Sequence, residues 1–251
     1  MVKPFYGAVP VVGSAVVLAA LLASAPVSAA DKLTAYADST YDTVVYGGVD
    51  FSRANSQQNG FGADAGFVTA VHGDISVSGW TVSANIGASQ SNDVGTDTDS
   101  VYGSALVGYQ WHSPQYYFAL NAGVHAVDND ESPSGGSTDG SEVGAVFQYG
   151  FETKGGMYFV QSYGSFSTAY DQVYAHAKVG VRGSHFTYGA ELTVFDEQDS
   201  DSTIRYGAFI GEIPLGNFRV GVAAGYQQEQ DPASDDGFYA TVQFSVPLSL
   251  R

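Results

Sequence analysis

The sequence predicts an all-β protein: a closed antiparallel transmembrane β-barrel, of twelve strands, with an N-terminal signal peptide that is cleaved. Three observations predict this fold. Apolar and polar residues alternate with a period of two in segment after segment. These segments have the length of a tilted membrane-spanning strand, and the connections between them are rich in turn residues. The start of the chain has the pattern of an export signal.

Residues 1–30 differ in character from the rest of the 251-residue chain. Lys3 precedes an apolar run over residues 8–23, and a stretch of small residues follows and ends at Ala30. This order of charged, apolar and small residues is that of a cleaved signal peptide. We therefore expect residues 31–251 to form a single outer-membrane β-barrel domain. The alternative is a retained membrane anchor, for which the run is short and interrupted.

The composition excludes several classes of protein. The chain has 9 Lys and Arg against 26 Asp and Glu, a formal net charge of -17, so a polyanion such as nucleic acid would be repelled. With 44% apolar residues the chain is not an acidic disordered tail. The absence of cysteine excludes a disulfide scaffold and a thiolate metal site.

The strands are identified by alternation along the chain. In residues 80–89, Trp80, Val82 and Ile86 share one face, and Thr81, Ser83 and Asn85 share the other. The same pattern gives candidate strands at residues 43–52, 61–72, 80–89, 101–112, 116–127, 142–152, 157–166, 173–182, 185–195, 203–211, 217–227 and 238–246. The weakest is 157–166, because Gln161 and Ser165 fall on its nominal apolar face.

The connections fall into two kinds. Those after the even-numbered strands are short, for example around Gly73-Asp74 and Gly183-Ser184. Those after the odd-numbered strands are mostly longer and polar, for example residues 90–100 and 128–141. Short turns at one end and longer loops at the other are typical of outer-membrane barrels, whose two termini lie on the short-turn side.

Aromatic residues fall near both ends of the predicted strands, on the apolar face. Such rings are favoured at the interfaces of a lipid bilayer. Those at the short-turn end are Trp80, Tyr109, Trp111, Tyr116, Tyr149 and Phe151, and those at the other end are Phe51, Phe61, Tyr226 and Phe238. The alternative is a soluble β-sandwich or a secreted barrel that buries the same apolar faces, because periodicity alone does not distinguish inside from outside.

The polar faces of the strands carry charges that a membrane barrel would direct into its lumen. These candidate site residues are Asp50, Asp64, Glu142, Glu152, His176, Lys178, Arg182, Glu191, Arg205 and Arg219. If Gly183-Ser184 is a two-residue turn, His176 lies opposite Glu191, with Lys178 on the diagonal. Two interpretations stay open: a salt-bridge network that fills a narrow barrel, or a transverse field that sorts polar solutes in a pore.

No catalytic arrangement or metal motif stands out. A barrel lipase would need a serine and a histidine on its lipid face, whereas His72, His112 and His125 fall on the inner face. The acidic connections, for example around Asp128 and Glu197, follow no calcium-loop pattern, and solvation explains them more simply than Ca²⁺ binding. We therefore expect no enzymatic activity, no cofactor and no metal.

Several short motifs are distributed over nearly all of the chain after residue 30. They are Gly73-Asp74 with Gly79-Trp80, Gly108-Tyr109-Gln110-Trp111, Gly140-Ser141-Glu142-Val143-Gly144-Ala145, Gly164-Ser165-Phe166-Ser167-Thr168-Ala169-Tyr170, Ala177-Lys178-Val179-Gly180-Val181-Arg182, Gly189-Ala190-Glu191 and Arg205-Tyr206-Gly207-Ala208-Phe209. Together they resemble the pattern of the cellulose biosynthesis protein BcsS family of bacterial outer-membrane barrels. Within these motifs Glu191 and Arg205 carry inward charges, and we expect them to form an interior pair.

The resemblance implies a barrel in the outer membrane of a Gram-negative bacterium that is associated with making or exporting cellulose, an exopolysaccharide. Because no catalytic arrangement stands out, we expect this role to be non-enzymatic. It also implies outer-membrane lipid, and a glucan chain or components of the cellulose synthase complex, as partners. The family's pattern transfers no functional residue securely. The alternative function is a small porin-like channel for polar solutes or oligosaccharides.

Overall fold

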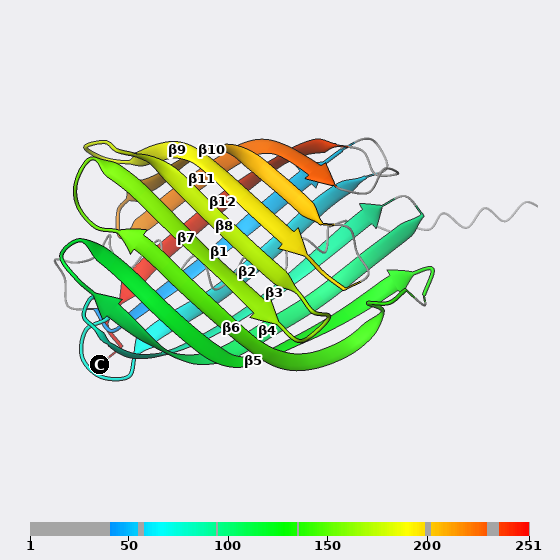
Figure 1. Cartoon of the computed structure of the whole chain (residues 1–251), viewed down its shortest axis with the longest axis horizontal. Helices are drawn as coiled ribbons and strands as arrows, with labels where there is room; N and C mark the ends of the chain where they lie inside the picture. Colours follow the sequence, from blue (N-terminus) through cyan, green and yellow to red (C-terminus); the bar gives the residue numbers. More distant parts are fainter. Residues whose placement is uncertain are drawn as a thin grey trace, which may run out of the picture.

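Antiparallel β-strands close into one barrel in the computed structural model of the protein (Figure 1). The structure describes residues 41–54, 58–93, 95–134, 136–198, 202–229 and 236–250. Its strands are β1 (Thr43–Arg53), β2 (Asn59–Ala70), β3 (Gly79–Asp93), β4 (Thr96–His112), β5 (Tyr116–Ser132), β6 (Gly140–Thr153), β7 (Tyr158–Ser167), β8 (Val173–Arg182), β9 (Thr187–Asp196), β10 (Thr203–Leu215), β11 (Phe218–Glu229) and β12 (Gly237–Leu248). The twelve-strand barrel predicted from the sequence is confirmed; the predicted signal peptide lies outside the described residues.

Each strand pairs with its neighbour in the chain, and β12 closes the barrel against β1, from Thr43↔Leu248 to Arg53↔Phe238. Closure leaves no strand edge unpaired, which is the condition for a sheet to stand in lipid. The amide of Leu250 donates to the carboxylate of Asp42 (3.1 Å to Oδ1), so both ends of the described chain lie at one end of the barrel. We call this the terminal end, and the opposite end the loop end.

The two faces of the wall differ as the alternation predicts. Large apolar side chains face outward, among them Ile86 (64% exposed) and Val143 (70%), whereas the inward set is buried. The aromatic residues at both ends also face outward; Trp80, Tyr109 and Trp111 form a continuous row of ring contacts. An apolar band bordered by aromatic rings is the outer surface of a membrane barrel.

The face assigned to β7 was wrong. Phe159, Gln161 and Tyr163, on the nominal apolar face of this strand, are buried in the interior, and Tyr158 and Val160 are exposed. Both faces of β7 carry aromatic residues, so composition could not orient the strand. The neighbouring strands decide its orientation through the pairing of Tyr163 with Gly150 on β6 and with His176 on β8.

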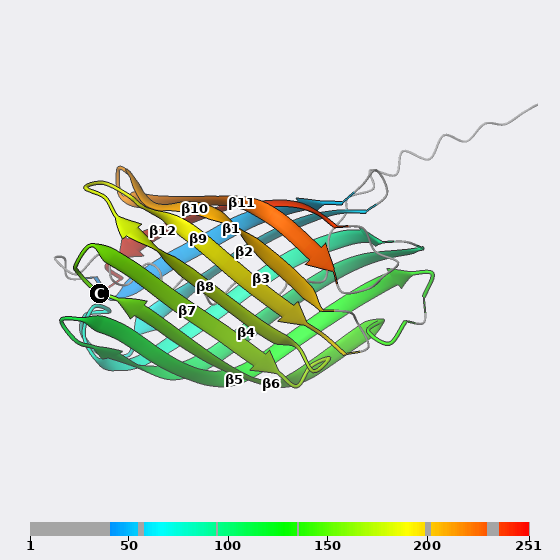
Figure 2. The ribbon, with the colours of Figure 1, turned by 45° about the horizontal axis from the view of Figure 1, so that its top comes forward.

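The loop end is built more from strands than from loops, which corrects the prediction of long connections there. Residues 94–95 alone join β3 to β4, and β5 continues to Ser132, so residues 90–100 and 128–132 are largely paired. Polar residues continue the hydrogen-bonded ladder beyond the apolar band, because the ladder uses the backbone alone. Figure 2 shows the hairpins β3–β4 and β5–β6 extending past the ends of β7–β10.

Two turns at the terminal end also differ from the prediction. The connection around Gly73-Asp74 spans residues 71–78 and is not a short turn. The β8–β9 connection has four residues, closed by the Gly183 amide and the Phe186 carbonyl (2.8 Å), so the register shifts by two. Lys178, rather than His176, therefore lies opposite Glu191.

Gly87 on β3 provides the space for an interior tyrosine. A Cβ at this position would lie 2.2 Å from the ring of Tyr102, which is buried on the facing strand β4. We expect Gly87→Ala to lower the free energy of unfolding by about 1–3 kcal/mol, because the ring must move within a filled interior. Urea unfolding of the barrel in lipid vesicles measures this. Gly79→Ala on the same strand is the control, since a Cβ there meets nothing within 4 Å; equal losses in both variants would contradict the explanation.

Candidate functional site

The interior of the barrel is occupied by side chains at successive levels. Near the terminal end, Val44, Tyr46 and Tyr117 belong to one buried apolar cluster. Phe159 and Phe209 pack together in a second cluster, with ring centroids 5.8 Å apart. Barrels of intermediate size are filled when their inward residues are long. The candidate functional site is therefore a packed polar interior that lies between apolar layers.

At the terminal end the β2–β3 connection folds back against the wall. Ile75 is buried in the first apolar cluster, and its amide donates to the carbonyl of Tyr41 (2.8 Å). The side-chain amide of Gln110 on β4 donates to the carbonyls of Ile75 (2.6 Å) and Val77 (2.8 Å). This connection is a fixed part of the barrel because its backbone is bonded on two sides.

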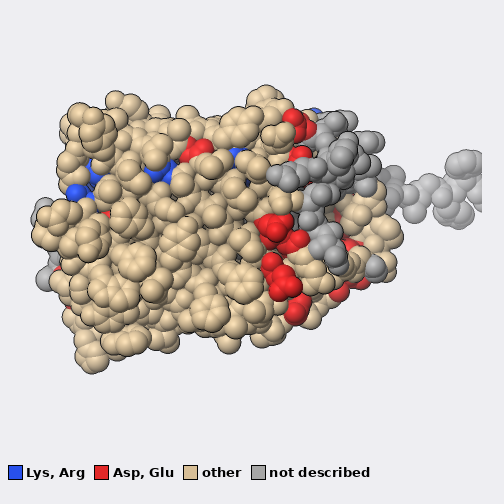
Figure 3. Space-filling view, viewed as in Figure 1, with Lys and Arg blue, Asp and Glu red and all other residues tan. Residues whose placement is uncertain are grey.

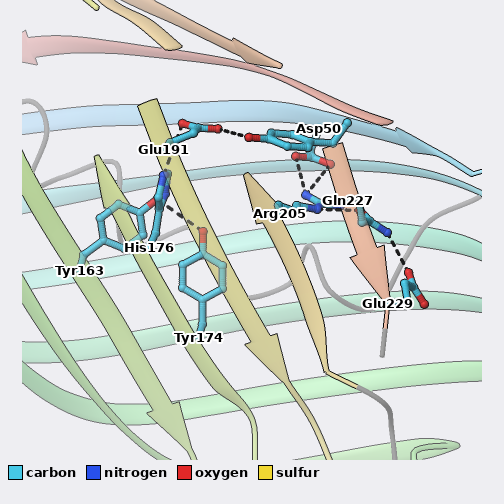
Figure 4. Close-up of polar contacts among 9 residues, drawn as sticks. Asp50, Tyr163, Tyr174, His176, Glu191, Arg205, Gln227 and Glu229 are labelled. Carbon is cyan, nitrogen blue, oxygen red and sulfur yellow. Dashed lines mark hydrogen bonds and ion pairs between the residues drawn. The ribbon is translucent and has the colours of Figure 1, made fainter. Parts of the chain in front are cut away.

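The central polar group is an ion pair between β1 and β10. Arg205 Nη1 lies 3.1 Å from Asp50 Oδ2 and 3.3 Å from Oδ1 (Figure 4). Arg205 Nε donates to Gln227 Oε1 (2.7 Å), and the guanidinium lies over the ring of Tyr239 at 5.3 Å. Gln227 in turn donates to Glu229 (2.8 Å). A buried charge pair with these additional bonds holds strands together that are not neighbours.

Glu191 on β9 organises a second polar group beside the first. It accepts a hydrogen bond from the Tyr239 hydroxyl (2.8 Å), and His176 Nε2 lies 3.4 Å away (Figure 4). His176 Nδ1 contacts the hydroxyl of Tyr163, which lies 3.4 Å from the hydroxyl of Tyr174. Glu191 and Arg205 were expected to pair; instead they are joined through Tyr239, because each takes a closer partner.

A third ion pair lies toward the terminal end. Arg182 Nη2 is 3.5 Å from Glu152 Oε1, and the same guanidinium donates to the carbonyls of Thr153, Gly155 and Tyr158. Glu152 also accepts from Gln161 Nε2 (3.3 Å). Arg182 thus fixes the β6–β7 connection as well as balancing the charge of Glu152.

Of the remaining predicted site residues, Lys178 lies opposite Glu191 in the register, and the other three lie apart from these three groups. Asp64 pairs in register with Gly48 on β1. Arg219 lines a small cavity of about 20 Å³ together with Lys178 and Glu212. Glu142 lies at the loop end and accepts a hydrogen bond from the amide of Tyr170 (3.1 Å). The structure therefore brings together most, but not all, of the predicted set.

The arrangement supports the salt-bridge interpretation of the interior. Arg205 and Arg182 are each paired with a carboxylate on a strand that is not an immediate neighbour, so the charges compensate in pairs. The sequence interpretation missed the tyrosines that connect the charges, Tyr163, Tyr174 and Tyr239. Tyr174 and Tyr239 fall on the polar, inward faces of β8 and β12, so the alternation could have identified them. Tyr163 was missed because the inward face of β7 was assigned to the wrong side of the strand.

At the loop end the β7–β8 connection, residues 168–172, folds into the mouth of the barrel. Ala169 and Tyr170 pack against Tyr102 and Val127. The Tyr170 hydroxyl donates to the Gly140 carbonyl (2.8 Å), and the amide of Gln198 donates to the Tyr170 carbonyl (2.9 Å). Tyr170 and its neighbour adopt positive φ, near 51° and 45°. Non-glycine residues hold that conformation when their surroundings fix it.

Carboxylates surround this connection. Burial, together with Glu142, Glu197, Asp128 and Glu131, raises the pKa of the Tyr170 hydroxyl. Burial also raises the pKa of Glu197 to about 7; Glu131 raises it further, and the hydrogen bond from Gln172 opposes the shift. Figure 3 shows Asp and Glu gathered at the loop end of the visible face, and Lys and Arg mainly toward the terminal end.

The described residues contain one buried serine–histidine contact that bears on enzymatic chemistry. Ser167 Oγ lies 3.0 Å from His125 Nδ1, and both residues are buried on the lumen side. Ser167 Oγ also accepts from the amide of Ala169 (3.1 Å), so this contact anchors the β7–β8 connection. Within the described ranges there is no group of three or more His, Cys, Asp or Glu suited to a metal ion. Nor does any helix there have the length and apolarity to cross a membrane.

The profile of one protein family matches nearly all of the barrel. The family is described as cellulose biosynthesis protein BcsS, and the match covers residues 44–248, from the start of β1 to the end of β12. No curated protein matches the chain.

Among solved structures, the barrel is similar to a mutant of TodX, a monoaromatic hydrocarbon channel. The TM-score is 0.54 at 7% identity, and the match covers 89% of this chain and 94% of that one. It is also similar to the translocator domain of autotransporter NalP from Neisseria meningitidis, with a TM-score of 0.48 and 10% identity; the match covers 83% of this chain and 89% of that one. A third similar structure is the β-domain of the Bordetella autotransporter BrkA, with a TM-score of 0.47 and 11% identity; the match covers 83% of this chain and 99% of that one. Of these three matches, the one to TodX has a TM-score above 0.5. Because the two sequences are only 7% identical, this match shows a similarity of fold alone.

Proposed function

The chain belongs to the cellulose biosynthesis protein BcsS family, and we propose that it serves extracellular cellulose production as a non-enzymatic barrel of the bacterial outer membrane. The observation that carries the proposal is the family match, which spans the barrel from β1 to β12.

The outer surface supports the location in the outer membrane of a Gram-negative bacterium. Exposed apolar residues such as Ile86, Val124 and Val143 form a band around the wall, and aromatic residues border it. Burying this band in lipid is favourable at roughly 25 cal/mol per Å². Outer-membrane lipid is therefore the first partner that we propose.

The packed interior supports an accessory role over that of an open conduit. Tyr163, His176 and Glu191 are buried at mid-height, and Tyr170 closes on Tyr102 above them. A glucan chain that crossed the lumen would have to displace these groups and break the ion pair of Arg205. We therefore propose that the barrel acts beside the path of the polymer, on the emerging glucan chain or on components of the synthase complex.

The interior also supports the absence of catalysis. The contact of Ser167 with His125 is buried under the β7–β8 connection, out of reach of lipid and of solvent. A nucleophile needs access to its substrate as well as a base. The replacement Ser167→Ala should therefore leave cellulose output unchanged.

Deletion of the gene in a cellulose-producing strain tests the proposed function. We expect cellulose, measured by dye binding at the cell surface, to fall, and to return when the wild-type gene is supplied. Unchanged output in the deletion strain would overturn the proposal. A Ser167→Ala gene should complement as well as wild type; failure with a folded barrel would overturn the non-enzymatic part.

The second candidate, a porin-like channel for polar solutes or oligosaccharides, is favoured by the charged interior. It is tested by planar-bilayer recording of the purified full chain. The packed lumen leads us to expect no sustained open-channel current. Long-lived conductance steps that oligosaccharides block would instead establish the channel.

A further inference from the structure

A groove crosses the outer wall of the barrel from β3 to β8 and has a volume of about 640 Å³. Its two sides are rows of outward side chains, and the members of a row lie opposite one another in the strand register. One row runs from Trp80 through Leu120 to Ala175, and the other from Val107 through Phe147 to Val173. The floor is the row between them, which includes the buried Gln148 and Tyr174. The groove therefore follows the ladder of the sheet, across the strands.

The sides of the groove are apolar and belong to the band that faces lipid. Leu120 is 47% exposed and Phe147 is 57% exposed. Tyr149, in the same row as Leu120, is fixed in place because its hydroxyl lies 3.1 Å from Ser162 Oγ. Its ring leans over Gly164, where a Cβ would lie 2.7 Å from the ring. Because the two hydroxyls satisfy each other, this side can stand in hydrocarbon, and the groove exists before any ligand enters it.

The groove rises obliquely through the membrane. Trp80 lies at the terminal end of β3, whereas Val173 begins β8 at the loop end. Five steps between neighbouring strands, at about 4.8 Å each, span roughly 24 Å. With strands tilted by about 40°, this span rises by roughly 15 Å along the membrane normal, which is half of a hydrocarbon core ~30 Å thick. The groove therefore has the depth of one leaflet.

We propose that this groove binds one acyl chain of a phospholipid from the periplasmic leaflet. A linear chain fits between two rows of side chains, whereas a second barrel presents a convex wall that would rest on the rims. Within a bilayer the gain comes from dispersion contacts, because the competing lipid tails are as apolar as the groove. A chain in the groove has protein contacts on three sides, and a chain on an even part of the wall has them on one.

The groups at the two ends of the groove decide which leaflet supplies the lipid. At the loop end, Asp196 lies opposite Val173 in the register, and Asp171 precedes Val173 by two residues. These carboxylates repel the phosphate of a lipid. At the terminal end, the rings of Trp80 and Tyr109 pack edge to face with centroids 5.5 Å apart, and their N–H and O–H groups suit the headgroup region. The headgroup therefore lies at the terminal end, which is the periplasmic side.

Quenching of tryptophan fluorescence by brominated phospholipid tests the site. The chain has two tryptophans, so Trp111→Phe leaves Trp80, which lines the groove, as the reporter. The full-length, folded barrel in detergent micelles is titrated with phosphatidylethanolamine that carries bromine on its acyl chains. We expect saturable quenching, which is stronger when bromine lies near the headgroup than when it lies near the end of the chain. Quenching that rises only in proportion to the lipid content overturns the site, and the reverse order of the two bromine positions overturns the leaflet.

Two variants of the Trp111→Phe parent locate the chain. Ala122→Phe places a ring in the groove and should raise the lipid concentration at half-maximal quenching by about fivefold or more, because the ring displaces contacts with the chain. Ala208→Phe is the matched control on the exposed wall of β10, outside the groove, and should change that concentration by less than about twofold. Heat-modifiable gel mobility confirms that each barrel is folded. Equal values for the parent and Ala122→Phe, or an equal loss in Ala208→Phe, overturn the assignment.

This inference rests on the proposed location in the outer membrane and is independent of the role in cellulose production. Co-flotation with vesicles of phosphatidylethanolamine and phosphatidylglycerol tests the location separately, and a folded barrel that does not float with them overturns the location. A barrel that floats with the vesicles but shows only proportional quenching keeps the location and loses the groove. Dimers cross-linked through this wall, with Trp80 unquenched, would overturn the lipid in favour of a second copy of the chain.

Discussion

Replacing Arg205 with methionine is expected to lower the free energy of unfolding by about 3–5 kcal/mol. Arg205 lies 3.1 Å from Asp50, and the two side chains are 7% and 13% exposed. Methionine keeps much of the apolar stem but removes the charge, so Asp50 stays buried without its cation. The bond to Gln227 and the contact with the Tyr239 ring are lost in the same change.

Urea unfolding of the variant in lipid vesicles, with wild type in parallel, measures the Arg205 effect. Arg53→Met at the exposed end of β1 is the control and should change stability by no more than about 0.5 kcal/mol. The double variant Asp50→Asn with Arg205→Met should recover part of the loss, since it leaves no uncompensated charge. A loss below about 1 kcal/mol in Arg205→Met would show that the pair does not hold β1 to β10.

Glu191→Gln is expected to cost about 3 kcal/mol, because it removes the negative charge that faces Lys178 while keeping the shape of the side chain. Lys178 is directly opposite in the register and is buried, and His176 lies 3.4 Å away. The Tyr239 hydroxyl can still donate to the amide oxygen, so the expected loss reports charge rather than packing.

A double-mutant cycle with Lys178→Met separates the coupling from other effects of Glu191→Gln. If Glu191 and Lys178 compensate each other, the double variant should be more stable than the sum of the two single losses predicts. Strict additivity, measured by the same urea unfolding, would place the partner of Glu191 elsewhere. His176→Gln would then be the next variant in the cycle.

The strand count, and the face of nearly every strand, followed from the sequence. Alternation places one side chain in two on each face of the wall, so Ile86 and Val143 had to face outward if the polar faces lined the lumen. The ends of the strands were harder to predict from the sequence. Residues 90–93 and 128–132 are polar, yet they extend β3 and β5, because backbone pairing continues wherever a partner strand does.

Register and pairing of the charges needed the folded chain. Four residues rather than two join β8 to β9, and this shift alone moves Lys178 opposite Glu191. Asp50 and Arg205 are 155 residues apart in sequence, and only closure of the barrel through β12 brings them together. The expected direct pair of Glu191 with Arg205 does not form. Arg205 instead pairs with Asp50, and Glu191 contacts Tyr239 and His176.

The sequence by itself determined a twelve-strand membrane barrel and its resemblance to the cellulose biosynthesis family, because both are read from patterns along the chain. Only the tertiary structure decided that the interior is packed, which carboxylate Arg205 and Arg182 each meet, and that the β7–β8 connection folds into the mouth at the loop end. The physical reason is that alternation gives the direction of a side chain, whereas contact across the lumen depends on register and closure. Those are fixed by all strands together.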